Sequence, residues 1–101
     1  MIYRARTMTL IPEKSAAVRD VSRRAATYVS EHYPGIHVEV LENIAGNRGQ
    51  IHMVTRCESL AALEAYEAQR LADAGWMALV DEVQSIEGVS ETTDSLYRVL
   101  T

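Results

Sequence analysis

The sequence predicts a single α+β domain with the element order βαββαβ, and three observations predict it. Residues 2–11 are rich in β-branched and aromatic types and stop at Pro12, where a helix can begin. A short connection with two glycines, residues 45–49, separates two further strand-like segments. Residues 95–100 return to a strand pattern at the end of the chain. This order is typical of a ferredoxin-like sandwich, in which helices cover one face of a four-stranded sheet.

The expected first strand leads directly into a helix over residues 13–32. Pro12 suits the first helical turn, where its missing N–H is not needed, and Glu13 suits the positive end of the helix dipole. Pro34 and Gly35 end the helix and turn the chain. The helix has one apolar stripe, formed at steps of three and four residues by Ala17, Val18, Val21, Ala25, Tyr28 and Val29.

The second half of the chain begins with a hairpin of two strands, residues 36–44 and 50–57. Ser59 is then a good N-cap for a second helix, because its hydroxyl can accept a free backbone N–H. Gly75 interrupts this helix, and a further helical segment follows over residues 76–85. Residues 86–94 are mostly polar and turn-like, so we expect the last strand to begin at Ser95.

Length and composition describe an ordinary globular chain. The 101 residues fit one domain, residues 1–101, with 48% apolar and 24% charged residues. The net charge is −4 and the charges are interspersed, which disfavours nucleic acid and anionic membranes as partners. The single cysteine, Cys57, cannot form an intrachain disulfide, and no apolar run or leader pattern is present. We therefore expect a cytoplasmic protein.

Helices on one face of the sheet leave the other face uncovered. A monomer would then expose a large surface of a kind that usually marks an interface. Two sheets packed face to face would cover both surfaces, so we expect a homodimer.

Four motifs resemble NIPSNAP-like proteins, a family of the dimeric α/β-barrel superfamily. They occur in the expected order along nearly the whole chain: Arg6-Thr7-x-Thr9-Leu10-x-Pro12-x-Lys14; Gln50-x-His52 with Glu58-Ser59-Leu60; Arg70-Leu71 with Trp76-x-x-Leu79; and Leu96-Tyr97-Arg98-x-Leu100. The resemblance implies a homodimer whose two sheets form a barrel-like core. It leaves the biochemical activity undefined.

His52 is the leading candidate for chemistry. It lies in the middle of a predicted strand, where its side chain can point into the uncovered face of the sheet. A neutral imidazole could act there as a general base or as a hydrogen-bond anchor. The alternative is a buried histidine that is satisfied by a backbone carbonyl or a carboxylate.

Arg4 and Arg6 share a face of the first strand if that strand is regular. An inward arginine could hold a carboxylate or an enolate oxygen through its planar guanidinium group. The alternative is an ion pair with Glu39 or Glu42, across the sheet or across the dimer.

Trp76 is expected to fill the gap between the helical segments and the sheet, or to form a wall of a ligand pocket. Cys57 has no catalytic partner pattern and is expected to be a small apolar residue. His37 and His52 lack a third ligand, so no metal site is expected. The chain has no phosphate-binding or nucleophile motif, and no cofactor is expected.

Three functional hypotheses follow. The first is a homodimer that binds a small apolar or aromatic molecule, between sheet and helices or between the two sheets, with Arg6, His52 and Trp76 in its wall. The second is a cofactor-independent monooxygenase acting on an aromatic or polyketide-like substrate, by analogy with related barrel families, with His52 as the base. The Asn–Trp–His set of some of those families is not intact here, because the first strand has no asparagine. The third is a purely structural or interaction role.

Overall fold

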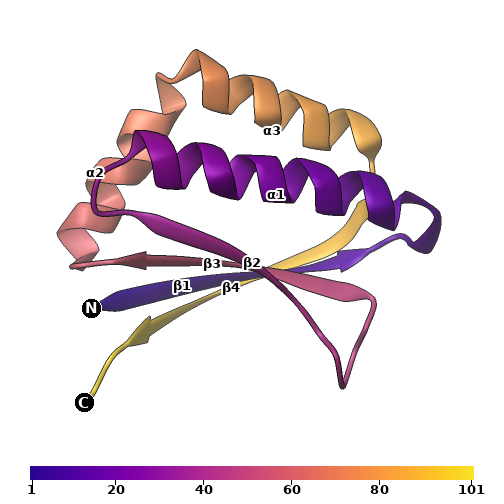
Figure 1. Ribbon diagram of the computed structural model, residues 1–101, viewed down its shortest axis with the longest axis horizontal. Helices are drawn as coiled ribbons and strands as arrows, with labels where there is room; N and C mark the ends of the chain where they lie inside the picture. Colours follow the sequence, from indigo (N-terminus) through magenta and orange to yellow (C-terminus); the bar gives the residue numbers. More distant parts are fainter.

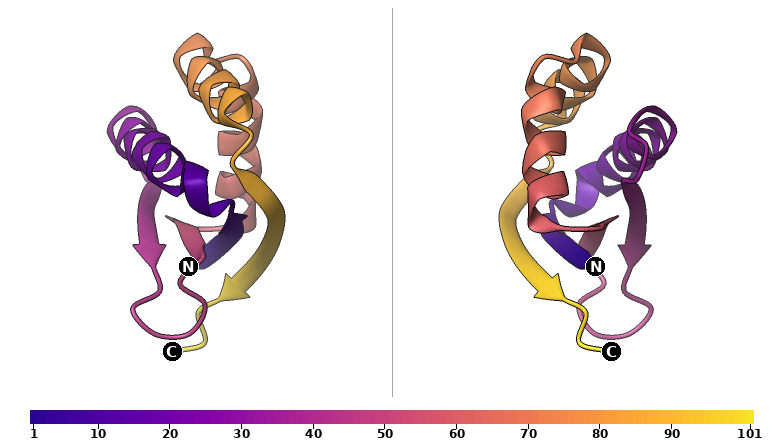
Figure 2. Two further views of the ribbon diagram at one scale, coloured as in Figure 1. Left: turned by 90° about the vertical axis from the view of Figure 1, so that its right-hand side faces the viewer. Right: turned by 90° about the vertical axis from the view of Figure 1, so that its left-hand side faces the viewer.

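Four strands and three α-helices make up the chain, and the computed structural model describes all 101 residues. The neighbouring strands are antiparallel and lie in the order β2-β3-β1-β4. All helices cover one face of the sheet, and the opposite face is bare (Figures 1 and 2). This is the predicted ferredoxin-like α+β fold. The elements are β1 (Ile2–Leu10), a 3-10 turn (Pro12–Lys14), α1 (Ser15–His32), β2 (His37–Glu42), β3 (Gln50–Cys57), α2 (Leu60–Leu71), α3 (Ala74–Ile86) and β4 (Val89–Arg98).

The predicted hairpin is confirmed, since β2 pairs with β3. The prediction for β4 was wrong at its start: the strand begins at Val89, six residues before Ser95. Its polar first half pairs with β1, with Thr92 opposite Met8 and Asp94 opposite Arg6. An edge strand with exposed residues can be polar, and such a sequence resembles a loop.

The break between α2 and α3 lies at Asp73, not at Gly75 as predicted. Asp73 caps α3 by accepting a hydrogen bond from the Trp76 backbone N–H (3.2 Å). The same carboxylate accepts hydrogen bonds from the hydroxyls of Tyr28 (2.7 Å) and Tyr33 (2.5 Å). Gly75 is required for a different reason, because a Cβ there would overlap the Tyr28 hydroxyl and lie 2.9 Å from Cζ of the ring.

Two apolar clusters form the core between the sheet and the helices α1 and α2. The larger one contains Ile2, Ala26, Val29, Tyr33, Ile36, Val38, Cys57, Leu63 and Tyr66. The smaller one contains Met8, Leu10, Val18 and Ile51. Cys57 is a buried free thiol, as expected of a small apolar residue. No residue of α3 is fully buried, because this helix packs against the sheet less closely than α1 does. None of the helices combines the length and the apolar character needed to cross a membrane.

Candidate functional site

A cavity of about 410 Å³ lies between the covered face of the sheet and the helices α1 and α3. Its volume is in the range of small-molecule sites. The floor comes from β1, β3 and β4, one side from α1, and the roof from α3. Its principal lining residues are Arg6, Met8 and Met53 in the floor, Val21 and Ala25 at the side, and Trp76, Leu79, Val80 and Val83 in the roof.

Local sequence explains why this space is open. The apolar residues of α3 recur at helical spacing, so they form one stripe that faces the sheet. Ser22 and Ala25 on α1 are small, and β4 presents Thr92 in place of a large apolar side chain. The stripe of α3 therefore covers the space without filling it.

Arg6 is held in the cavity wall by a bidentate ion pair. Its Nε and Nη2 donate to the two carboxylate oxygens of Asp94 on β4 at 2.8 and 2.9 Å. The pair raises the pKa of Arg6 and lowers the pKa of Asp94, mainly through these hydrogen bonds. The partner of Arg6 is therefore neither Glu39 nor Glu42: Glu42 binds Arg19 (2.5 Å) instead.

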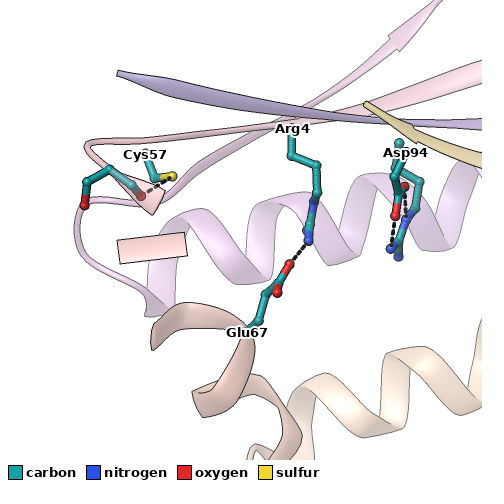
Figure 3. A network of polar contacts seen from close by, with 6 residues as sticks. Arg4, Cys57, Glu67 and Asp94 are labelled. Carbon is teal, nitrogen blue, oxygen red and sulfur yellow. Dashed lines mark hydrogen bonds and ion pairs between the residues drawn. The ribbon is translucent and has the colours of Figure 1, made fainter. Parts of the chain in front are cut away.

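Arg4 lies on the same face of β1 as Arg6, as predicted. It is almost fully buried, with 9% of its surface exposed, and its Nη1 donates to Glu67 on α2. Figure 3 shows the Arg4 side chain reaching from the sheet to this helix, apart from the pair at Asp94. The two strand arginines are thus both neutralised by carboxylates from other elements.

Arg70 on α2 is the third arginine at this end of the cavity. Its guanidinium carbon lies 4.4 Å from the centre of the Tyr66 ring and 4.6 Å from that of Trp76. Such stacking on aromatic faces is favourable for a guanidinium group. Desolvation lowers the pKa of Arg70, and no carboxylate forms an ion pair with it.

A second, smaller cavity of about 30 Å³ lies among these arginines. Arg4, Arg6, Thr55, Tyr66 and Arg70 line it, and three of its other lining residues are Val29, Met53 and Trp76. Arg6, Met53 and Trp76 also line the large cavity, so the two spaces adjoin.

His52 lies on the bare face of the sheet and not in either cavity. Thr7 Oγ1 lies 2.8 Å from His52 Nδ1, and Asn43 Oδ1 lies 2.7 Å from His52 Nε2. Asn43 also donates its amide N–H to the Asn47 carbonyl (2.6 Å), which directs its oxygen toward the ring. Nε2 donates to the amide oxygen of Asn43, whereas the Thr7 hydroxyl can either donate to Nδ1 or accept from it. Its partners are a hydroxyl and an amide, and not the carbonyl or carboxylate that was expected.

The structure thus brings Arg6 and Trp76 together and separates both from His52. Sequence reasoning did not assign Tyr66, Glu67, Arg70 and Asp94 to the site. The four-residue spacing of Tyr66 and Arg70 on a helix could have indicated their contact. Asp94 could not have been found, because it fell in the segment expected to be a turn.

Comparisons with known proteins find likeness in structure and none in sequence. No protein-family model matches the chain, and no curated protein matches it significantly. Among solved structures, an uncharacterized NIPSNAP domain protein from Burkholderia xenovorans has a TM-score of 0.81 at 11% identity, over 98% of this chain and 94% of that one.

Two candidate antibiotic biosynthesis monooxygenases are similar to a comparable degree. The protein from Nitrosomonas europaea has a TM-score of 0.79 at 14% identity, with 100% of both chains covered. The protein from Deinococcus radiodurans has a TM-score of 0.75 at 18% identity, over 98% of this chain and 92% of that one. At these identities the likeness concerns the fold. The predicted resemblance to NIPSNAP-like proteins is confirmed at that level, and the chain shares the same ferredoxin-like fold with the candidate monooxygenases.

Proposed function

We propose that the chain is a homodimeric, NIPSNAP-like protein that binds a small apolar or aromatic molecule in the cavity beneath α3. The observation that carries this proposal is the cavity itself, of about 410 Å³, with hydrophobic side chains at nine of its fifteen lining residues. A concave, mostly apolar wall with a few fixed polar groups is the usual composition of a small-molecule site. Arg6 supplies the fixed polar group and Trp76 supplies an aromatic wall.

The homodimer is supported by the chemistry of the bare sheet face. Tyr3, Ala5 and Thr7 of β1 alternate with the covered residues and lie on that face, as does Val54 opposite Ala5. Leu41 on β2 and Tyr97 on β4 add exposed apolar surface, with 45% and 56% exposed. A second copy of the same chain can cover these exposed apolar side chains by packing its own bare face against them. The free buried Cys57 fits a cytoplasmic protein.

A cofactor-independent monooxygenase is the second candidate, supported by the candidate monooxygenases that share the fold. Such a reaction requires a base within reach of the substrate. His52 is on the other face of the sheet, so it could serve only a molecule held between two sheets of a dimer. The ionisable residues that line the cavity beneath α3 are Arg6, whose guanidinium group is paired with Asp94, and Glu87. The binding function needs no such base and is therefore preferred.

Titration with N-phenylnaphthylamine, a neutral aromatic probe that brightens in apolar sites, tests the proposal. Val80→Phe places a larger side chain in the roof of the cavity and should weaken binding by about tenfold. Val99→Phe makes the same change at a half-exposed position outside the cavity and should leave binding unchanged. Absence of binding, or equal binding to Val80→Phe and the natural protein, would refute the cavity as a ligand site.

A further inference from the structure

We infer that the ligand is a monoanionic acid whose carboxylate enters the small cavity between Arg4 and Arg70, while its apolar body occupies the large cavity. This inference rests on the proposed function. The small cavity has the size of one or two water molecules, which is also the space needed for the oxygens of a carboxylate. Because Arg6, Met53 and Trp76 border both spaces, one molecule can occupy them together.

The balance of charge favours an anion. Three guanidinium groups, those of Arg4, Arg6 and Arg70, meet here, and two carboxylates neutralise two of them. Glu67 binds Arg4 and Asp94 binds Arg6, which leaves the cation of Arg70 without an ionic partner. Burying a charge without a partner is costly, and one carboxylate would compensate it.

Two buried donors are free to bind this carboxylate. The Nε atoms of Arg4 and Arg70 are inaccessible to solvent and have no hydrogen-bond partner. Buried polar groups are nearly always satisfied, so two unsatisfied donors around one cavity indicate a missing acceptor. A carboxylate has several acceptor positions and can receive hydrogen bonds from both.

Tyr66 and Trp76 position the guanidinium group of Arg70 to bind the carboxylate. Tyr66 and Trp76 cover the guanidinium group at 4.4 and 4.6 Å, so its N–H groups remain available at its edge. A guanidinium group fixed in this way loses little further conformational entropy when it binds a carboxylate. Trp76 also borders the large cavity, so the same residue contacts the cation and the apolar body of the ligand.

Displacement of bound N-phenylnaphthylamine by naphthoate and by naphthamide tests the inference. The two competitors have the same aromatic body and differ in charge. We expect naphthoate to displace the probe at a concentration at least about tenfold lower than naphthamide, since charge-assisted hydrogen bonds are about twice as strong as neutral ones. Acetate, which lacks the aromatic body, should not displace the probe.

Arg70→Gln should remove the advantage of naphthoate, and Arg70→Lys should retain part of it. Arg23→Gln is the matched control, because Arg23 is an exposed residue of α1 and its loss changes the net charge equally. Circular dichroism establishes that each variant is folded, and the comparison of acid with amide in the natural protein needs no variant.

Equal displacement by the acid and the amide would overturn the carboxylate site while leaving the cavity proposal intact. An equal loss in Arg23→Gln and Arg70→Gln would also overturn it, because general surface charge would then be the cause. If the probe itself fails to bind, the proposed function fails and the carboxylate site fails with it.

Discussion

Arg6 and His52 project from opposite faces of the sheet, although their strands are hydrogen-bonded neighbours. In the pairing of β1 with β3, Arg6 lies opposite Met53 and Thr7 lies opposite His52. Since adjacent residues of a strand point to opposite faces, this register directs Arg6 toward α3 and His52 toward the bare face. The two residues therefore belong to different environments, one of them a cavity and the other a proposed dimer interface.

The cavity should be insensitive to loss of the imidazole. His52→Ala removes the hydrogen bonds to Thr7 and Asn43 on the bare face, so we expect unchanged affinity for N-phenylnaphthylamine and a lower melting temperature. Fluorescence titration and thermal denaturation measure the two effects. If this variant loses the probe, the ligand lies between the sheets and not beneath α3.

The proposed dimer should depend on the bare face. Ala5→Glu places a carboxylate at the centre of that face, and the cost of burying it should shift the protein to monomer at micromolar concentration. Ala17→Glu, the same change at an exposed position of α1, should leave the dimer intact. Light scattering after size exclusion measures the mass. A natural protein that is a well-folded monomer would contradict the proposed packing of sheets.

Asp73 should be important for stability, because it caps α3 and accepts hydrogen bonds from Tyr28 and Tyr33. We expect Asp73→Ala to lower the melting temperature by about 4–8 °C, the usual effect of losing one helix cap in a domain of this size. Replacing Asp81, an exposed residue of α3 outside this network, provides the control: Asp81→Ala should have a much smaller effect.

The same residue gives stability a defined dependence on pH. Hydrogen bonds from Tyr33 and Tyr28 lower the pKa of Asp73 from 3.8 to about 2 in the folded chain. A depressed pKa in the folded state means that the contribution is fully present above the unfolded value of 3.8 and is lost as the pH falls toward 2. Urea unfolding between pH 5 and pH 2 should therefore show a smaller loss of stability in Asp73→Ala than in the natural chain. Parallel curves would show that Asp73 makes no such contribution.

Gly75 should tolerate no side chain while Tyr28 is present. The added Cβ of Gly75→Ala would lie 2.9 Å from Cζ of Tyr28 and would overlap its hydroxyl, so we expect a loss of about 1–3 kcal/mol. Tyr28→Phe removes the hydroxyl, and the double variant should therefore be more stable than the sum of the two single effects predicts. Additive losses in denaturant unfolding would mean that the two residues do not interfere.

The fold could be predicted from sequence because its signals are local. Pro12, Ser59 and the apolar stripe of α1 each indicate a boundary or a face without reference to the rest of the chain. The start of β4 could not be predicted, because Ser90 to Asp94 are polar residues on an exposed edge and have no apolar alternation.

The candidate site could not be predicted, because it depends on strand register and on how the helices pack, which local sequence patterns do not reveal. The separation of Arg6 from His52 follows from strand register, and a shift of one residue would have reversed it. The cavity lies between α3 and the sheet, and the position of α3 depends on tertiary contacts such as the hydrogen bond from Tyr28 on α1 to Asp73. The contact of Arg70 with both Tyr66 and Trp76 needs the turn between α2 and α3, so neither helix alone predicts it.

Trp76 is the only tryptophan of the chain, and it borders both cavities while stacking on Arg70. All indole emission therefore originates from one position, next to Arg70, the residue that we propose to bind the carboxylate of the ligand. An unlabelled compound that enters the cavity changes the surroundings of Trp76, and we therefore expect it to change the intrinsic fluorescence of the protein. Fractionated cell extracts can accordingly be screened against the natural chain by its intrinsic emission alone, without a dye or a tag.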